Sequence, residues 1–237
     1  MMTNMRIAVA VLACFIACPL HSQDDLHIPP VKIPILPSAG RNAQAFTPKG
    51  WTVEQQTTGD LNGDGLPDLV FVLHDTDPRN VIKNDSLGVE ELDTNPRILG
   101  VAFAVPSGGY TLAAQNSTLI TRWTEPNMED YFEEGTIEIK RGAFQVSLHY
   151  FANAGGWDTG SDTFTFRWQH GSFELIGFEN DNFKRNTGES SKTSINYSTG
   201  TGIITGDGKK TRSLTLPHRP LKTLDTIGDG ISFDYPQ

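Results

Sequence analysis

The stretch GDLNGDGLPDLVFV, residues 59–72, places several oxygen-bearing side chains in a short loop immediately before an apolar run. Carboxylate, amide and backbone carbonyl oxygens are the ligands that Ca²⁺ prefers, and a tight loop with such groups at alternate positions directs them inward together. The loop over residues 60–68 therefore predicts a calcium site. Its expected ligands are the side chains of Asp60, Asn62, Asp64 and Asp68 and the backbone carbonyl of Leu66.

Two features separate this loop from an EF-hand loop. Its twelfth position, where an EF-hand carries a bidentate glutamate, is Phe71, and its flanking segments have the composition of strands rather than helices. Gly65, at the sixth position, permits the sharp turn that a metal-binding loop needs. The alternative is a turn rich in Asp and Gly without metal, which would leave the repulsion among its carboxylates uncompensated.

The D-x-N-x-D-G-x-x-D spacing of this loop resembles the calcium loop of FG-GAP and VCBS repeat-containing proteins, a group that includes integrin heads and secreted bacterial proteins. The resemblance implies Ca²⁺ as the cofactor and the ligand set given above, but no activity. A propeller of such repeats would carry one loop per blade, whereas this chain has one good copy. A second stretch, Asp225–Asp234, carries part of the pattern and is interpreted as a turn.

A glycine-rich loop is the second candidate for function. In NAGGWDTGSD, residues 153–162, three glycines surround Trp157, and Asp158 follows it. An aromatic side chain on such a loop is often used to recognise a sugar face or a protein pocket. Trp157 and Asp158 are therefore candidate recognition residues, with a tryptophan folded back onto the core as the alternative.

The sequence contains no familiar catalytic motif. It has no nucleophile elbow and no phosphate-binding loop, and its six histidines lack a metal-ligand spacing. We therefore expect a non-catalytic, exported, calcium-binding protein that interacts with a protein or glycan of the cell envelope. The alternative is an exported hydrolase of envelope polysaccharide or peptidoglycan, which would need a pair of carboxyl groups in a cleft, one with a raised pKa.

The first 22 residues predict export. Arg6 precedes the apolar run Ile7–Leu20, which is short for a membrane-spanning helix, and small Ser22 precedes a cleavage point. A second interpretation makes Cys18 the lipidated first residue of an outer-membrane lipoprotein. The mature protein is expected in the periplasm or outside the cell. Because Cys14 and Cys18 are the two cysteines of the chain, the cleaved form would contain no disulfide.

Composition restricts the partners. The formal net charge of −9 disfavours nucleic acid and anionic membrane surfaces. No later segment approaches the roughly 18 consecutive apolar residues of a transmembrane helix, so no span is expected in the mature chain. A lipid anchor at Cys18 would be the remaining attachment to a membrane.

Short alternating segments separated by glycine-containing turns follow residue 49. TIEIK and FQVSLHYF flank the turn RGA, and DTFTFRW and SFELIGFE flank QHG. Alternation of apolar and polar residues is typical of half-buried strands. We expect an all-β fold, an antiparallel meander of hairpins in a sandwich, partial propeller or barrel, with little helix apart from the signal peptide.

The chain is expected to divide into three parts. Residues 1–22 form the signal peptide, residues 23–48 a proline-rich extended tether, and residues 49–237 a single all-β domain that contains the calcium loop 60–68. The apolar side chains within residues 23–48 leave open that this segment packs along the domain.

Overall fold

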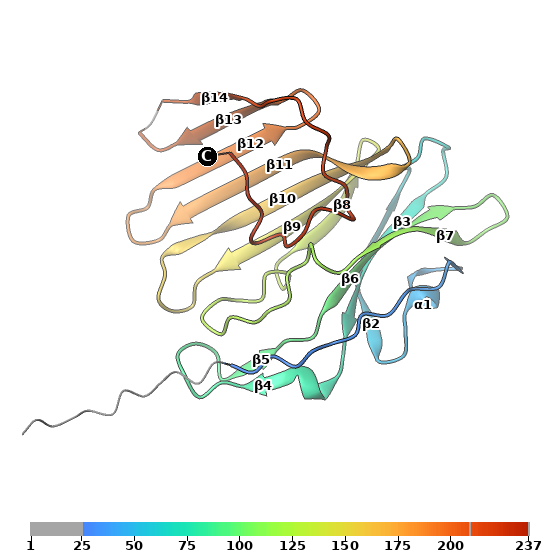
Figure 1. Ribbon diagram of the computed structural model, residues 1–237, viewed down its shortest axis with the longest axis horizontal. Helices are drawn as coiled ribbons and strands as arrows, with labels where there is room; N and C mark the ends of the chain where they lie inside the picture. The colour runs from blue at the N-terminus through green and yellow to red at the C-terminus, as the bar shows by residue number, and fades with distance from the viewer. Residues whose placement is uncertain (1–25, 209, 237) are drawn as a thin grey trace, which may run out of the picture.

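The computed structural model describes residues 26–208 and 210–236, so the expected signal peptide and Cys18 lie outside the described residues. Two antiparallel sheets, of five and seven strands, contain most of the chain (Figure 1). A third, small sheet pairs β4 (Val81–Lys83) with β5 (Glu91–Asp93), after the short 3-10 helix η1 (Pro78–Asn80). The prediction of an all-β, antiparallel fold is confirmed.

The five-stranded sheet has the order β1-β7-β6-β3-β2, and its strands are joined by antiparallel pairing. The strands are β1 (Ala39–Gly40), β2 (Trp51–Gly59), β3 (Asp68–Asp75), β6 (Arg97–Ala104) and β7 (Tyr110–Asn116). The loop predicted to bind calcium is the β2–β3 connection.

The seven-stranded sheet is a meander in which each strand pairs with the next one in the sequence, and it curls into half a barrel. Both hairpins expected at RGA and QHG are present, as the β8–β9 and β10–β11 connections. The strands are β8 (Thr136–Lys140), β9 (Ala143–Phe151), β10 (Asp158–Gln169), β11 (Ser172–Lys184), β12 (Ser190–Asn196), β13 (Thr201–Gly206) and β14 (Arg212–Thr215).

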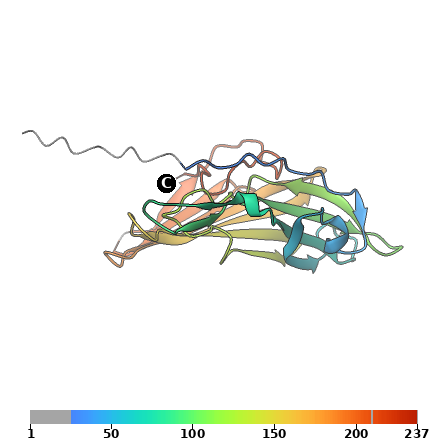
Figure 2. The same ribbon diagram turned by 90° about the horizontal axis from the view of Figure 1, so that it is seen from below.

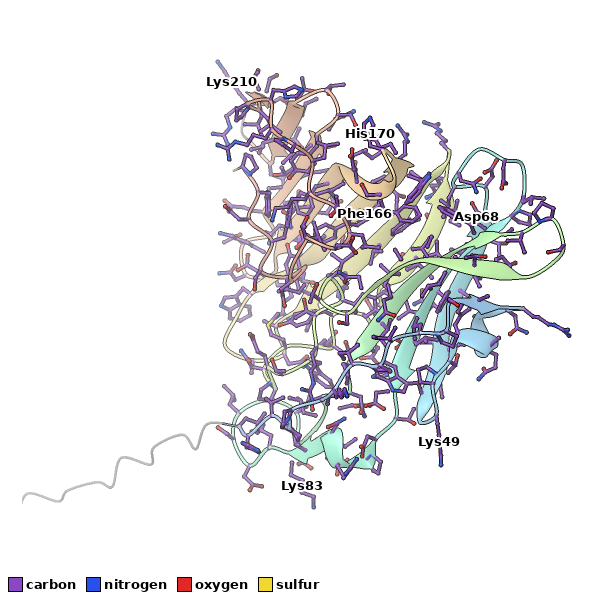
Figure 3. The ribbon with its side chains drawn as sticks, turned by 45° about the vertical axis from the view of Figure 1, so that its right-hand side comes forward. Lys49, Asp68, Lys83, Phe166, His170 and Lys210 are labelled. Carbon is purple, nitrogen blue, oxygen red and sulfur yellow. The ribbon has the colours of Figure 1, made fainter. Side chains whose placement is uncertain are left out.

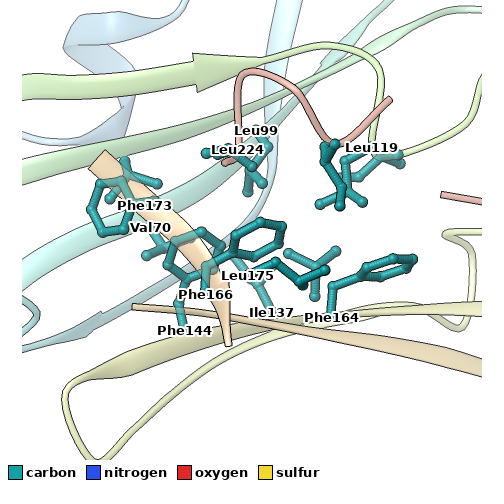
Figure 4. Close-up of a cluster of buried hydrophobic side chains, with 14 of the residues drawn as sticks. Val70, Leu99, Leu119, Ile137, Phe144, Phe164, Phe166, Phe173, Leu175 and Leu224 are labelled. Carbon is teal, nitrogen blue, oxygen red and sulfur yellow. The ribbon is translucent and has the colours of Figure 1, made fainter. Parts of the chain in front are cut away.

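The main hydrophobic core lies between the two sheets (Figure 4). Successive residues of a strand face opposite sides of the sheet, so alternate positions of β3 and β6, such as Val70 and Leu99, face Phe144 and Phe166 of the larger sheet. Two hydrogen bonds of Gln55 in β2 join the sheets, one donated to the carbonyl of Gly135 and one accepted from the backbone of β8. We call the opposite side of the seven-stranded sheet its outer face.

A second cluster covers the other face of the five-stranded sheet. Phe71 stacks on Phe46 of the short helix α1 (Ala43–Phe46) with ring centroids 5.3 Å apart, and Leu36 is buried beside them. The backbone N–H of Leu36 donates to Gln115 at 2.8 Å. The described part of the proline-rich segment therefore packs along this sheet (Figure 2). No helix of the described residues is long and apolar enough to cross a membrane.

The C-terminal segment, residues 216–236, crosses the inner face of the seven-stranded sheet (Figure 1). Phe233 packs against Phe164 and Phe178, each at a centroid distance of 5.1 Å. Asn116 of the smaller sheet donates to the carbonyl of Leu224 at 2.7 Å, which ties this segment to both sheets.

A buried ion cluster lies between the sheets, at the end away from the β2–β3 loop. Arg97 donates to Glu54 and to Asp130, with closest N–O distances of 2.7 Å in both pairs. Burial alone would lower the pKa of Arg97, but the hydrogen bonds that it donates to these two carboxylates raise the pKa above its ordinary value. The guanidinium therefore stays charged and holds β2, β6 and the segment before β8 together.

Candidate metal loop and surface groove

The backbone of the β2–β3 loop is wrapped around the carboxylate of Asp60. Its Oδ1 accepts the N–H of Gly63 at 2.7 Å, and its Oδ2 accepts the N–H of Gly65 at 3.0 Å. Both glycines have φ near +80°, where residues with a side chain are disfavoured. The glycines predicted to allow a sharp turn therefore also hold Asp60 in place.

Two successive side-chain turns form the tip of the loop. Asn62 Oδ1 accepts the N–H of Asp64 at 2.9 Å, and Asp64 Oδ1 accepts the N–H of Leu66 at 2.8 Å. The amide nitrogen of Asn62 donates to the second carboxylate oxygen of Asp64 at 3.1 Å. The loop is thus ordered by its own polar groups, with Asp64 at the exposed tip.

Asp68 is buried at the base of the loop, as the first residue of β3 (Figure 3). Its two carboxylate oxygens accept the N–H groups of Leu61 and Ala104, each at 2.8 Å. Burial raises the pKa of Asp68, and the nearby charge of Asp64 raises it further, while these hydrogen bonds lower it. Asp68 therefore connects the loop to β6 as well as to β3.

The oxygen atoms of this loop are ligands of the kind that a hard cation such as Ca²⁺ prefers. Among the described residues Asp60, Asp64 and Asp68 take part in no ion pair, and a carboxylate oxygen that accepts one N–H keeps a second lone pair. The described residues contain no group of three or more His, Cys, Asp or Glu side chains that could hold a metal. An ion at this loop would therefore depend on the Asn62 amide and the Leu66 carbonyl as well as on carboxylates.

The second, partial copy of the pattern forms turns. Asp229 Oδ1 accepts the N–H of Ser232 at 2.8 Å, and Ile227, which stands where the motif needs an oxygen ligand, is buried in the main core. At this position the segment therefore buries an apolar side chain in the core, whereas the first loop has the amide oxygen of Asn62.

Trp157 lies on an exposed loop that Arg185 holds in place. The side chain of Trp157 is 60% exposed, and its carbonyl accepts the N–H of Arg185 at 2.9 Å. The guanidinium of Arg185 donates to the carbonyls of Ala152 and Gly156 and lies over the ring of Phe151 at 4.0 Å. Asp158, the next residue, is the exposed first residue of β10.

An open groove of about 440 Å³ lies on the outer face near this loop. Phe183, which sequence reasoning missed, is 43% exposed beside it and pairs with Thr159, two residues after Trp157. We call it the Phe183 groove. Its other main lining side chains are Thr159, Asp181, Ser190, Lys192, Thr205 and Asp207.

Hydrogen bonds fix the charged side chains of the Phe183 groove. Lys192 Nζ donates a hydrogen bond to the carboxylate of Asp181 at 3.0 Å, and this bond raises the pKa of Lys192. The N–H and the hydroxyl of Ser190 both donate to Asp207 at 2.9 Å and lower its pKa. The groove thus offers fixed hydroxyl and charged groups beside an exposed aromatic ring.

The carboxyl group whose pKa is raised most clearly lies outside the Phe183 groove. Burial raises the pKa of Asp162 to about 6, and one hydrogen bond from Asn180, at 2.8 Å, partly offsets this shift. Asp162 is 7% exposed, points to the inner face of the sheet, and does not line the Phe183 groove. The pairing of a high-pKa acid with a second acid, which the hydrolase alternative needs, is not found in that groove.

We compared the chain with known proteins. No family model matches it, and neither the curated proteins nor the solved structures gave a match.

Proposed function

We propose that the protein is a non-catalytic, exported, calcium-binding β protein that recognises a glycan of the cell envelope. The observation that carries the proposal is the β2–β3 loop, in which three carboxylates lie within nine residues and take part in no ion pair of the described chain. A bound cation would offset their mutual repulsion. The ligands would be those that the sequence predicts, Asp60, Asn62, Asp64, Leu66 and Asp68.

Calcium would have a structural role in this proposal. Because Asp68 bonds to the backbone of both Leu61 and Ala104, an ion at the loop would stabilise the connection between β2, β3 and β6. A ligand that binds the folded chain and not the unfolded one raises the free energy of unfolding by mass action. Calcium should therefore increase stability without moving the sheets.

The support for glycan recognition comes from the other end of the outer face. Aromatic rings pack against the apolar faces of sugars, while fixed hydroxyl and charged groups hydrogen-bond to sugar hydroxyls. Trp157 and Phe183 supply exposed rings, and the lining of the Phe183 groove supplies the polar groups. A protein partner is the other occupant that the experiments below would reveal.

Thermal denaturation with and without calcium tests the metal site. With the millimolar dissociation constants of extracellular modules, 10 mM Ca²⁺ should stabilise the wild type by about 1–3 kcal/mol. Asp64→Ala should remove this response, because it deletes a ligand at the exposed tip of the loop. Asp85→Ala, which changes another exposed aspartate, should keep it. Equal calcium responses of wild type and Asp64→Ala would contradict the assignment.

Retention on insoluble envelope polysaccharide tests recognition. The wild type should be retained, and Trp157→Ala should reduce the retained fraction at least about tenfold through loss of ring stacking. Ile203→Ser is the control, because it removes another exposed apolar side chain of the same sheet. Equal retention of wild type and Trp157→Ala would refute a role of the tryptophan, and retention on purified envelope protein alone would refute the glycan.

A further inference from the structure

A second groove, of about 410 Å³, opens on the outer face at the opposite ends of the strands. Lys140, Ala143 and Arg167 form one row across β8, β9 and β10, so two cationic side chains flank a methyl group. Strands lie about 4.8 Å apart, which places the two cationic residues about 10 Å apart along the backbone row. Arg141, in the β8–β9 turn, and the side chains of Gln145, Thr165 and Ile176 complete the lining.

The two arginines of this groove lack anionic partners. Lys140 pairs with Glu138, but within residues 26–208 and 210–236 neither Arg141 nor Arg167 has an ion pair or a side-chain hydrogen bond. Both are exposed. Two guanidinium groups without a described ion pair thus border one groove of a chain whose net charge is −9. Glu174, the register partner of Arg167 on β11, hydrogen-bonds to Gln169 and His170 instead.

The backbone of Arg141 gives independent support. Its φ is +53°, in the left-handed region, and Gly142 follows with φ +69°. Two-residue hairpin turns of this kind favour Asn, Asp or Gly at the first position. The neighbouring β10–β11 turn has the same conformation but carries His170, a residue type that is enriched in this region. An arginine is therefore an unfavourable residue for this turn, and strained backbone positions of this kind cluster at binding sites.

We propose that this groove binds an anionic group, a carboxylate or a phosphate, carried on a saccharide. Guanidinium groups bind both anions through paired N–H donors. The volume exceeds that of a single ion and is in the range of small-molecule sites. Since the whole chain is acidic, the ligand carries isolated anionic groups rather than a dense row of them.

The saccharide part of the inference rests on the proposed function and on the surface beside the groove. Gln145 donates to the hydroxyl of Thr165 at 3.0 Å, and the hydroxyls of Ser147 and Thr163 are 2.8 Å apart in the next row across the sheet. These uncharged polar groups continue from the arginines across the outer face and suit the hydroxyls of a sugar.

The groove also adjoins the predicted metal loop. A Cβ added to Gly142 would lie 4.0 Å from the carbonyl oxygen of Asp60, so the β8–β9 turn lies beside the start of that loop. A cation bound there would reduce the repulsion between the loop and an anionic ligand. Calcium should therefore tighten anion binding moderately, and chelation should weaken it without abolishing it.

Titration with small probes, followed by NMR chemical shifts, tests the inference. Digalacturonate supplies the carboxylate, glucose 6-phosphate the phosphate, and maltose is the neutral control. At least one acidic probe should bind about tenfold more tightly than maltose, and that probe identifies the anion. Equal binding of the acidic and neutral probes would overturn the proposal. Failure of both acidic probes to bind, even after the salt concentration of the titration buffer is lowered tenfold, would also overturn it.

Arg141→Gly is the decisive variant. Glycine relieves the left-handed strain, so the melting temperature should stay or rise, while affinity for the acidic probe should fall at least tenfold. His170→Gly makes the same backbone change in the neighbouring turn and should leave affinity unchanged. Unchanged affinity in Arg141→Gly would overturn the assignment. Trp157→Ala should bind the acidic probe as the wild type does. Loss of polysaccharide retention and loss of anion binding can therefore be observed separately.

Discussion

Asp68 and Asp162 are both buried carboxylates, but hydrogen bonds compensate their burial to different extents. Asp68 receives two backbone N–H groups and lies at the base of the metal loop. Asp162 receives one amide from Asn180 and lies under the C-terminal segment, near Tyr235, whose pKa is raised to about 12 by burial and, less, by the charge of Asp162. The poorly compensated group is therefore Asp162, on the inner face.

Asp162 should make stability fall as the pH rises. Its folded-state pKa of about 6 exceeds the ordinary value of 3.8, so the native state binds the extra proton between these two pH values. The contribution to stability is complete below the unfolded pKa and is lost as the pH passes about 6. Asp162→Asn should increase the free energy of unfolding at pH 7.5 by up to about 3 kcal/mol.

Urea unfolding at pH 4.5 and at pH 7.5 measures this effect. Wild type and Asp162→Asn should differ by about 1 kcal/mol at the lower pH, roughly a third of the difference at pH 7.5, because pH 4.5 lies only just above the unfolded-state pKa of 3.8. A difference of the same size at both pH values would show that the substitution acts through packing and not through titration.

At the scale of elements, both faces of the five-stranded sheet are covered. β3 and β6 appear in the sequence as continuous apolar runs, in agreement with burial on both sides. The described residues before β2 cover the face that points away from the main core, through Leu36 and Phe46. This segment is therefore part of the core of the protein.

Substitutions of the neighbouring residues Leu36 and Ile35 test whether the segment before β2 stabilises the protein by packing on this sheet. Leu36 is 4% exposed, so Leu36→Ala should lower the free energy of unfolding by about 2–5 kcal/mol through loss of burial and creation of a cavity. Ile35 is 91% exposed, and Ile35→Ala should cause little change. Chemical denaturation of both variants measures the difference. Similar stabilities would mean that the segment contributes little packing energy.

The strands that sequence reasoning located are those with clean alternation and glycine turns. The hairpins β8–β9 and β10–β11 are examples, because each has a two-residue turn between regular strands. The short strands β1, β4 and β5 were missed, since two or three residues carry no periodicity. The ligands of the metal loop could be predicted from spacing, whereas their hydrogen bonds depend on where β6 places Ala104.

At the scale of the whole molecule, the sequence could not show which sheet face stays uncovered. Phe183 and Arg167 lie in strands that alternate like their neighbours, and they become candidates for binding because nothing in the described chain covers the outer face beside them. Their partners in each groove come from separate strands, such as β8 and β10, so their proximity is a property of the tertiary structure.

The path of the C-terminal segment has a consequence for the order of folding. Phe233 completes a cluster whose other members belong to β10 and β11, and Leu224 bonds to β7, more than 100 residues earlier in the chain. Phe164 and Phe178 of the larger sheet therefore lack part of their cover until residue 233 has been synthesised. This part of the core can therefore form only after residues 216–236 have been added to the chain.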